Sequence, residues 1–103
     1  MNAYALTPSA ESDLEEIWVY IAADNPEAAD GLESDIYEAC QFLADNPGIG
    51  QSRPSWTGKP VRFWPVRQNY LIVYFPERMP LEIQRIFHAA RNIPKLLDED
   101  IEG

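Results

Sequence analysis

The sequence predicts one α+β domain: an N-terminal strand, a helical hairpin, and a three-stranded antiparallel meander whose one face the helices cover. Two observations lead to this fold class. The first half of the chain repeats apolar residues with a helical period, and the second half holds three short runs rich in Val, Ile, Tyr and Phe. A striped helix and a one-faced sheet bury their apolar surfaces economically against each other. The 103 residues suit a single domain over 1–103.

Three apolar runs in the second half are predicted to be the strands of the meander. They span Val61–Val66, Tyr70–Phe75 and Leu81–Ala89, with short turns between them. Connections this short join antiparallel neighbours, since a parallel return needs a crossover of about a dozen residues or more. Pro65 cannot donate a ladder hydrogen bond, so it predicts an edge strand or a bulge. Strict alternation places Arg85 among apolar side chains, unless a bulge re-aims it.

A short apolar segment, Ala3–Leu6, is predicted to form the first strand, and the first helix follows directly. Thr7 suits the N-cap and Pro8 the first helical position, because the first N–H groups of a helix have no partner within it. Apolar residues then recur at i, i+3, i+4 and i+7. The stripe consists of Leu14, Ile17, Trp18 and Ile21.

A second helix begins in the same way, with Asn25 as N-cap and Pro26 at the first position. Asn46-Pro47-Gly48 ends it. So short a connection makes the two helices roughly antiparallel, as a helical hairpin. The stripe of the second helix consists of Ala29, Leu32, Ile36, Cys40 and Leu43.

The remaining segments carry weaker patterns. Residues 47–60 hold three glycines and three prolines and predict a loop. Loops of this length are often functional or mobile. Trp56 in this loop is expected either to anchor it on the core, which we favour, or to be an exposed contact residue. Residues 92–97 predict a short helical turn, and the acidic tail 98–103 is expected to fray.

Charge is divided unevenly along the chain, whose formal net charge is −9. Residues 1–52 contain eleven Asp and Glu and no Lys or Arg, whereas residues 53–97 contain all eight Lys and Arg and two acidic residues. An acidic protein is a poor general binder of nucleic acid, because phosphate neutralisation needs clustered cations. A basic C-terminal surface can still meet an acidic protein or an RNA. The alternative is that these charges are only solvated faces.

Composition also bears on location. The sequence has no run of about 18 apolar residues that would span a membrane, and its N-terminus lacks the pattern of a secretory signal. Cys40 is the only cysteine, so no internal disulfide can form, which agrees with a reducing cytoplasm. Because Cys40 lies on a predicted core stripe, we expect a buried, inert thiol. The sequence therefore predicts a cytoplasmic protein with no membrane association.

A search for chemistry finds few candidates. No phosphate-binding loop, dinucleotide fingerprint or zinc-ligand spacing is present, so no metal and no cofactor are expected. His88 is the only histidine. It is either a general base between Arg85 and Arg91 or a structural histidine hydrogen-bonded at the end of the sheet, which we favour. Arginine suits phosphate or carboxylate recognition because its planar fork binds oxoanions bidentately. The other arginine candidates are Arg53, Arg62 and Arg67.

The ordered set of segments resembles the RelE/ParE toxins of bacterial type II toxin–antitoxin systems. YALTPSA at 4–10 is similar to that family's first strand and helix start, and DLEEIWVYI at 13–21 is similar to its first helix. Arg62–Val66 and Tyr70–Tyr74 resemble its two central strands. IQRIFHAARN at 83–92 resembles its last strand with a His-small-x-Arg ending. The resemblance covers nearly the whole chain.

Within that family, the ribosome-dependent mRNA endonucleases use a cluster of Lys, Arg and Tyr or His on the sheet. Ahead of the meander this chain has a single lysine, Lys59, and the acidity of the chain disfavours ribosome binding. It is more similar to the ParE branch, which the resemblance implies to be inhibitors of DNA gyrase from plasmid stabilisation systems. The resemblance also implies a cognate antitoxin that lays an extended and a helical segment over the hairpin and sheet.

The resemblance thus implies two sets of site residues. The expected antitoxin-binding residues are Leu14, Trp18, Tyr37, Arg62, Arg67 and Arg85. If the chain were a nuclease, the catalytic residues would be Arg62, Arg85, His88 and Arg91. We expect a gyrase-directed toxin that forms a hetero-oligomer with its antitoxin and does not bind DNA alone. The alternatives are a RelE-like ribosome-dependent mRNA endonuclease and a non-toxic family member that only binds a partner.

Overall fold

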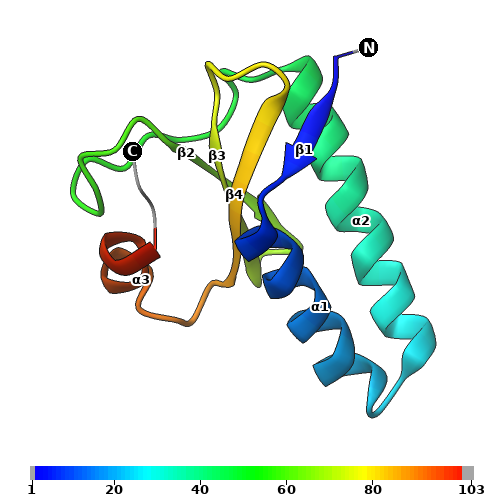
Figure 1. The fold of residues 1–103 in the computed structure, drawn as a ribbon. Coiled ribbons are helices and arrows are strands. Elements are labelled where there is room, and N and C mark those ends of the chain that lie inside the picture. Colours follow the sequence, from blue (N-terminus) through cyan, green and yellow to red (C-terminus); the bar gives the residue numbers. More distant parts are fainter. Residues whose placement is uncertain (1, 101–103) are drawn as a thin grey trace.

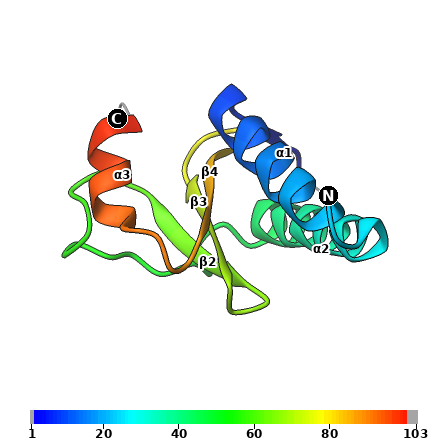
Figure 2. The same cartoon turned by 90° about the horizontal axis from the view of Figure 1, so that it is seen from below.

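The computed structural model describes residues 2–100 as an α+β domain with three layers (Figure 1). A helical hairpin covers one face of a four-stranded sheet, and a C-terminal helix lies on the other face, as Figure 2 shows. The elements in chain order are β1 (Tyr4–Leu6), α1 (Pro8–Ala22), α2 (Pro26–Asp45), β2 (Arg62–Val66), β3 (Tyr70–Phe75), β4 (Leu81–His88) and α3 (Ile93–Asp100).

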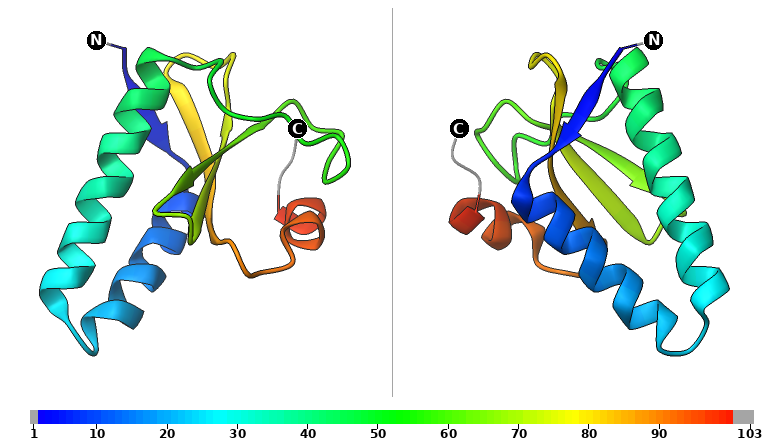
Figure 3. Two further views of the ribbon diagram at one scale, coloured as in Figure 1. Left: turned by 180° about the vertical axis from the view of Figure 1, so that it is seen from behind. Right: turned by 45° about the vertical axis from the view of Figure 1, so that its right-hand side comes forward.

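The sheet is mixed, with the strand order β1-β4-β3-β2. β2, β3 and β4 form the predicted antiparallel meander, and their ends agree with the prediction to within one residue. β1 lies parallel to β4, with Tyr4 beside Leu81 and Leu6 beside Ile83, and it leads straight into α1 (Figure 3). β2 is an edge strand, as Pro65 predicted.

Both predicted helix starts are confirmed. The Thr7 side chain accepts a hydrogen bond from the backbone N–H of Ala10 at 3.1 Å, and the Asn25 side chain accepts one from Ala28 at 3.1 Å. The Thr7 hydroxyl also donates to the carbonyl of Gln84 at 2.9 Å. The cap of α1 therefore also fixes the helix to β4.

The apolar stripes of the hairpin pack against the sheet, as predicted. Leu14 is 4% exposed and Ile36 is fully buried, and both belong to one cluster with Ile72, Tyr74 and Ile83. Each such side chain, when fully buried, contributes roughly 1.5–3 kcal/mol. The hairpin and the helix-facing side of the sheet thus form the larger of two cores.

A β-bulge in β4 interrupts the strict alternation along this strand, which is the alternative that the sequence left open for Arg85. Ile83 pairs with Tyr74 and Arg85 pairs with Val73, so Gln84 is an extra residue without an opposite partner. The bulge exchanges the faces of all later residues, and Ile86 joins Ile83 in the helix-side core. Arg85 therefore does not share a face with Ile83.

The opposite face of the sheet carries a second core. Ile93 and Leu97 of α3, four residues apart, are buried there with Leu71, Val73 and Phe87. Five successive residues of β3 are buried, because apolar layers cover both faces of this strand.

This helix corrects two predictions about the chain end. The short turn expected over 92–97 is part of a helix that continues to residue 100, so residues 98–100 of the supposedly frayed tail are helical. The rest of that tail, 101–103, lies outside the described residues. The acidic composition of this segment concealed the helix, which is held by burial of two side chains against distant strands.

Tyr74 and Phe63 of the sheet both hold the long loop before β2 through their side chains. The hydroxyl of Tyr74 accepts a hydrogen bond from the N–H of Gly50 at 2.9 Å and donates to the carbonyl of Pro47 at 2.8 Å. Trp56 packs edge-on against Phe63, with ring centroids 5.2 Å apart. Trp56 is therefore an anchor, the alternative that we favoured from the sequence.

Substituting Gly50 tests the first of these attachments. A Cβ atom at Gly50 would lie 2.8 Å from Cε1 of the buried Tyr74 ring and closer still to its hydroxyl, whereas one at Gly48 would meet nothing within 4 Å. We expect Gly50→Ala to lower the free energy of unfolding by about 1–3 kcal/mol, since overpacking displaces the ring. Urea denaturation is the measurement, with Gly48→Ala as the matched control. Equal effects of the two substitutions would contradict this packing.

The buried Cys40 thiol gives a pH-dependent prediction. Burial raises its pKa from 9.0 to about 12. Above pH 9 the thiol therefore ionises in the unfolded chain and stays protonated in the folded one, so its contribution to stability is complete below pH 9 and is lost as pH rises. Between pH 8.5 and 10, the stability of the native sequence should fall by about 1 kcal/mol more than that of Cys40→Ala. If the native sequence and Cys40→Ala differ in stability by the same amount at pH 8.5 and at pH 10, the thiol titrates normally in the fold.

Candidate partner-binding site

One buried ion pair fixes α1 against β4. Asp13 is 8% exposed, and its two carboxylate oxygens accept hydrogen bonds from the Arg85 guanidinium at 2.7 and 2.8 Å. The same carboxylate accepts the backbone N–H of Ile86 at 3.0 Å. β1 pairs with β4 only as far as Ile83, so Asp13 satisfies a backbone group that no strand reaches.

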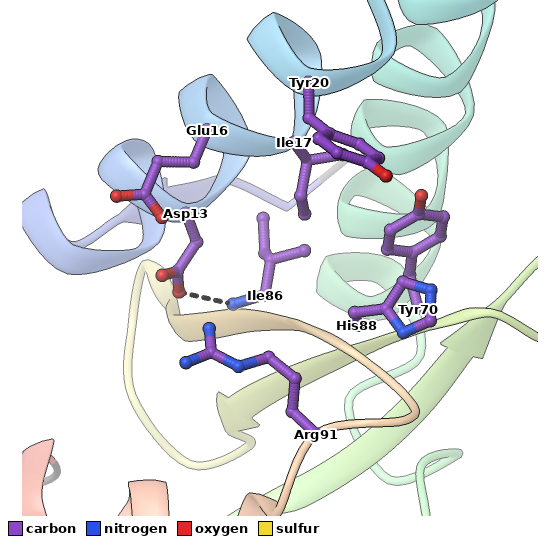
Figure 4. Close-up of a pocket in the computed structure, with 8 residues that line it drawn as sticks. All are labelled: Asp13, Glu16, Ile17, Tyr20, Tyr70, Ile86, His88 and Arg91. Carbon is purple, nitrogen blue, oxygen red and sulfur yellow. Dashed lines mark hydrogen bonds between the residues drawn. The ribbon is translucent and has the colours of Figure 1, made fainter.

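A cleft of about 380 Å³ opens beside this pair, between α1 and the neighbouring ends of β3 and β4 (Figure 4). Its apolar floor comes from Ile17 and Ile86. Tyrosine and charged side chains from α1, from β3 and from the chain just after β4 surround this floor. The lining residues are Asp13, Glu16, Ile17, Tyr20, Tyr70, Ile86, His88 and Arg91.

His88 has a structural hydrogen bond at this edge of the cleft. Its Nδ1 accepts the backbone N–H of Ala90 at 3.1 Å, and its ring meets Tyr70 edge-on with centroids 5.3 Å apart. A neutral imidazole that accepts at Nδ1 carries its proton on Nε2. This bond at the end of β4 is the role we favoured from the sequence.

The four residues of the expected nuclease set do not form one cluster. His88 and Arg91 line the same cleft, but the charge of Arg85 is paired with Asp13. Arg62 pairs with Tyr74 on β3, whereas His88 pairs with Tyr70. The two pairs are therefore four residues, or about 13 Å, apart along β3. The Arg62 guanidinium donates to the carbonyl of Gly50 at 2.7 Å.

Three of the six expected antitoxin-binding residues meet in a second hollow, between α1 and α2. Leu14, Trp18 and Tyr37 line it together with three glutamates. Leu14 is buried and forms its floor, whereas Tyr37 is 42% exposed. The Trp18 indole donates to Asp30 of α2 at 2.9 Å, which links the two helices.

The other three expected residues lie elsewhere. Arg67, in the β2–β3 turn, pairs with Asp35 on α2. Arg62 and Arg85 have the partners described above, on the sheet side of the hairpin. The six expected residues thus divide between three that line the hollow and three arginines that lie apart from it.

Two features of the site escaped sequence reasoning. Asp13 is absent from the apolar stripe predicted for the first helix, but it lies three residues after Ala10 and four before Ile17, on the buried side. An acidic residue at a core-facing position was the signal for a buried partner. Tyr20 and Tyr70 carried no comparable signal, since only the fold brings them to one cleft.

Two searches of the described residues bear on other functions. In residues 2–100 no group of three or more His, Cys, Asp or Glu is placed to hold a metal ion. No helix in this part of the chain combines the length and apolar character needed to cross a membrane.

The fold is that of a small α+β protein with one hollow on its helical hairpin and another at one end of its sheet. The family described as the ParE toxin of the type II toxin–antitoxin system parDE matches residues 4–93. This chain therefore belongs to the ParE toxin family, which agrees with the resemblance found in its sequence.

A solved structure supports the same assignment. A chain of the chromosomal ParDE TA system from P. aeruginosa is similar with a TM-score of 0.68 and 27% sequence identity, covering 85% of this chain and 96% of that one. The comparison with curated proteins found no significant match.

Removing the Asp13 carboxylate tests the ion pair on which the cleft depends. Asp13→Ala leaves the guanidinium of Arg85, itself only 12% exposed, without its carboxylate. We expect the free energy of unfolding to fall by about 3–5 kcal/mol, because removing one partner of a buried ion pair is costly. Glu15→Ala, an exposed acid on the same helix, is the matched control for urea denaturation.

A second variant separates charge from packing. In Asp13→Ala/Arg85→Met the guanidinium that lost the Asp13 carboxylate is also removed, so part of the lost stability should return. Two results would contradict the role given to this pair. Either Asp13→Ala lowers the free energy of unfolding no more than Glu15→Ala does, or the double variant is less stable than Asp13→Ala.

Proposed function

We propose that this ParE-family chain arrests cell growth by inhibiting DNA gyrase in the cytoplasm, and that a cognate antitoxin neutralises it in a hetero-oligomeric complex. The observation that carries the proposal is the family match over residues 4–93, which spans all four strands and both helices of the hairpin. Stabilisation of a plasmid or another inherited element is the biological role proposed for such a pair.

The arrangement of cationic side chains supports gyrase inhibition over RNA cleavage. Phosphoryl chemistry requires several cations aimed at one phosphate. Here the two arginines Arg62 and Arg85 are engaged within the fold, and the remaining pair, His88 and Arg91, shares its cleft with Glu16. A carboxylate at this place repels the phosphate that a nuclease must hold.

The hollow between α1 and α2 is the proposed antitoxin site. It combines an apolar floor at Leu14 with the two aromatic side chains Trp18 and Tyr37. Half-exposed aromatic residues around a buried aliphatic floor are typical anchors for a helix laid in a groove.

Induced expression tests the toxin activity. We expect growth arrest with induction of a DNA-damage reporter, loss of supercoiling by purified gyrase when the protein is added, and rescue when the adjacent reading frame is co-expressed. An early stop codon in the same vector is the control. No arrest would refute the proposal, and a tight partner complex without arrest would indicate a non-toxic family member.

Mapping transcript ends in the same cultures separates the two toxic mechanisms. Intact messages together with inhibited gyrase are expected. Cuts at ribosomal A-site codons with normal supercoiling would overturn gyrase inhibition and indicate a RelE-like endonuclease.

A further inference from the structure

The hollow between α1 and α2 is anionic as well as aromatic. Its polar lining consists of the carboxylates of Glu11, Glu15 and Glu33, and no Lys or Arg lines it. Neither helix of the hairpin contains a basic residue, because none occurs before Arg53. The negative charge of the hollow is therefore not balanced from within the hairpin.

The sheet does not supply the missing cations either. Among residues 2–100, the observed salt bridges are those of Arg67 with Asp35, Arg78 with Glu82, and Arg85 with Asp13. None of these arginines reaches the three glutamates of the hollow. Partial burial raises the pKa of the Tyr37 hydroxyl, and the charges of Glu33 and Glu11 contribute to the same shift, so the hollow has a negative local potential.

The shape of the hollow restricts what can enter. At about 380 Å³ it accepts one or two side chains of a partner rather than a whole helix. Aromatic rings bind guanidinium and ammonium groups through the ring quadrupole, and Trp18 and Tyr37 supply two such rings. The carboxylates attract the same groups by charge. The buried Leu14 suits the aliphatic stem of such a side chain.

We propose that the occupant of this hollow is a cationic amphipathic helix of the antitoxin, which inserts Arg or Lys side chains beside its apolar anchors. The inference rests on the proposed antitoxin role of the hollow and adds the charge of the partner segment. An acidic segment is disfavoured, since like charges juxtaposed across an interface cost affinity.

Two synthetic peptides test this proposal. Both are 20-residue amphipathic helices with the same Leu and Ala pattern, and they carry either Arg or Glu at every charged position. Isothermal titration with the purified full chain should show binding of the Arg peptide that weakens from 50 to 300 mM NaCl. The Glu peptide should not bind. Binding of the Glu peptide as tightly as the Arg peptide would overturn the proposal.

A matched pair of triple variants separates the hollow from general attraction by an acidic protein. In the first, Glu11→Gln, Glu15→Gln and Glu33→Gln neutralise the hollow. In the second, Asp24→Asn, Glu77→Gln and Asp98→Asn change the net charge equally at exposed positions that do not line it. The first should weaken the Arg peptide about tenfold and the second less than about twofold. Equal losses would show that no specific site exists.

The result is independent of toxicity. If the chain binds the Arg peptide through the hollow but does not arrest growth, the proposed function fails and this inference stands. If the chain arrests growth and the adjacent reading frame rescues it, while both triple variants bind the Arg peptide equally, the proposed function stands and this inference fails.

Discussion

The carboxylate of Asp13 at the open edge of β4 is the interaction on which the rest of the fold depends. β1 has three residues and β4 has eight, so most of the outer edge of β4 has no neighbouring strand. The start of α1 replaces that strand. Thr7 donates its N–H to Ile83 at 3.0 Å and its hydroxyl to Gln84 at 2.9 Å, and Asp13 then accepts the N–H of Ile86. These bonds fix the position of α1 and thereby the walls of the cleft in Figure 4.

The bulge at Gln84 allows this one strand to serve two cores. Before it, Ile83 faces the hairpin, and the extra residue restores Ile86 to that side while Phe87 turns toward α3. Without the bulge, the Arg85 side chain would be directed at the hairpin core, where no carboxylate lines the cluster. The bulge and the Asp13–Arg85 pair are therefore two parts of one arrangement.

Much of this architecture could be predicted because its signals are local. The caps at Thr7 and Asn25, the two apolar stripes and the short turns all act within a few residues, and each was identified correctly. The prediction failed where distant segments decide. The partners Asp13 and Arg85 are 72 positions apart. The extra residue in β4 left one trace, the charge of Arg85 in an apolar pattern, and that trace did not decide between strict alternation and a bulge.

The charge pattern shows the same limit for function. The basic residues of the second half suggested a cationic surface, but most of its arginines have partners or contacts within the fold. Arg53 stacks on Trp56, Arg62 binds a loop carbonyl, and Arg67 pairs with α2. Arginines engaged in this way keep the loop and turns in place, so their side chains are held within the fold. The glutamates along the hairpin have no such partners in the described part of the chain, so the unbalanced charge of this protein lies on its helices. The hollow between α1 and α2 combines this charge with aromatic side chains, and it lies outside the half of the sequence that holds the cations.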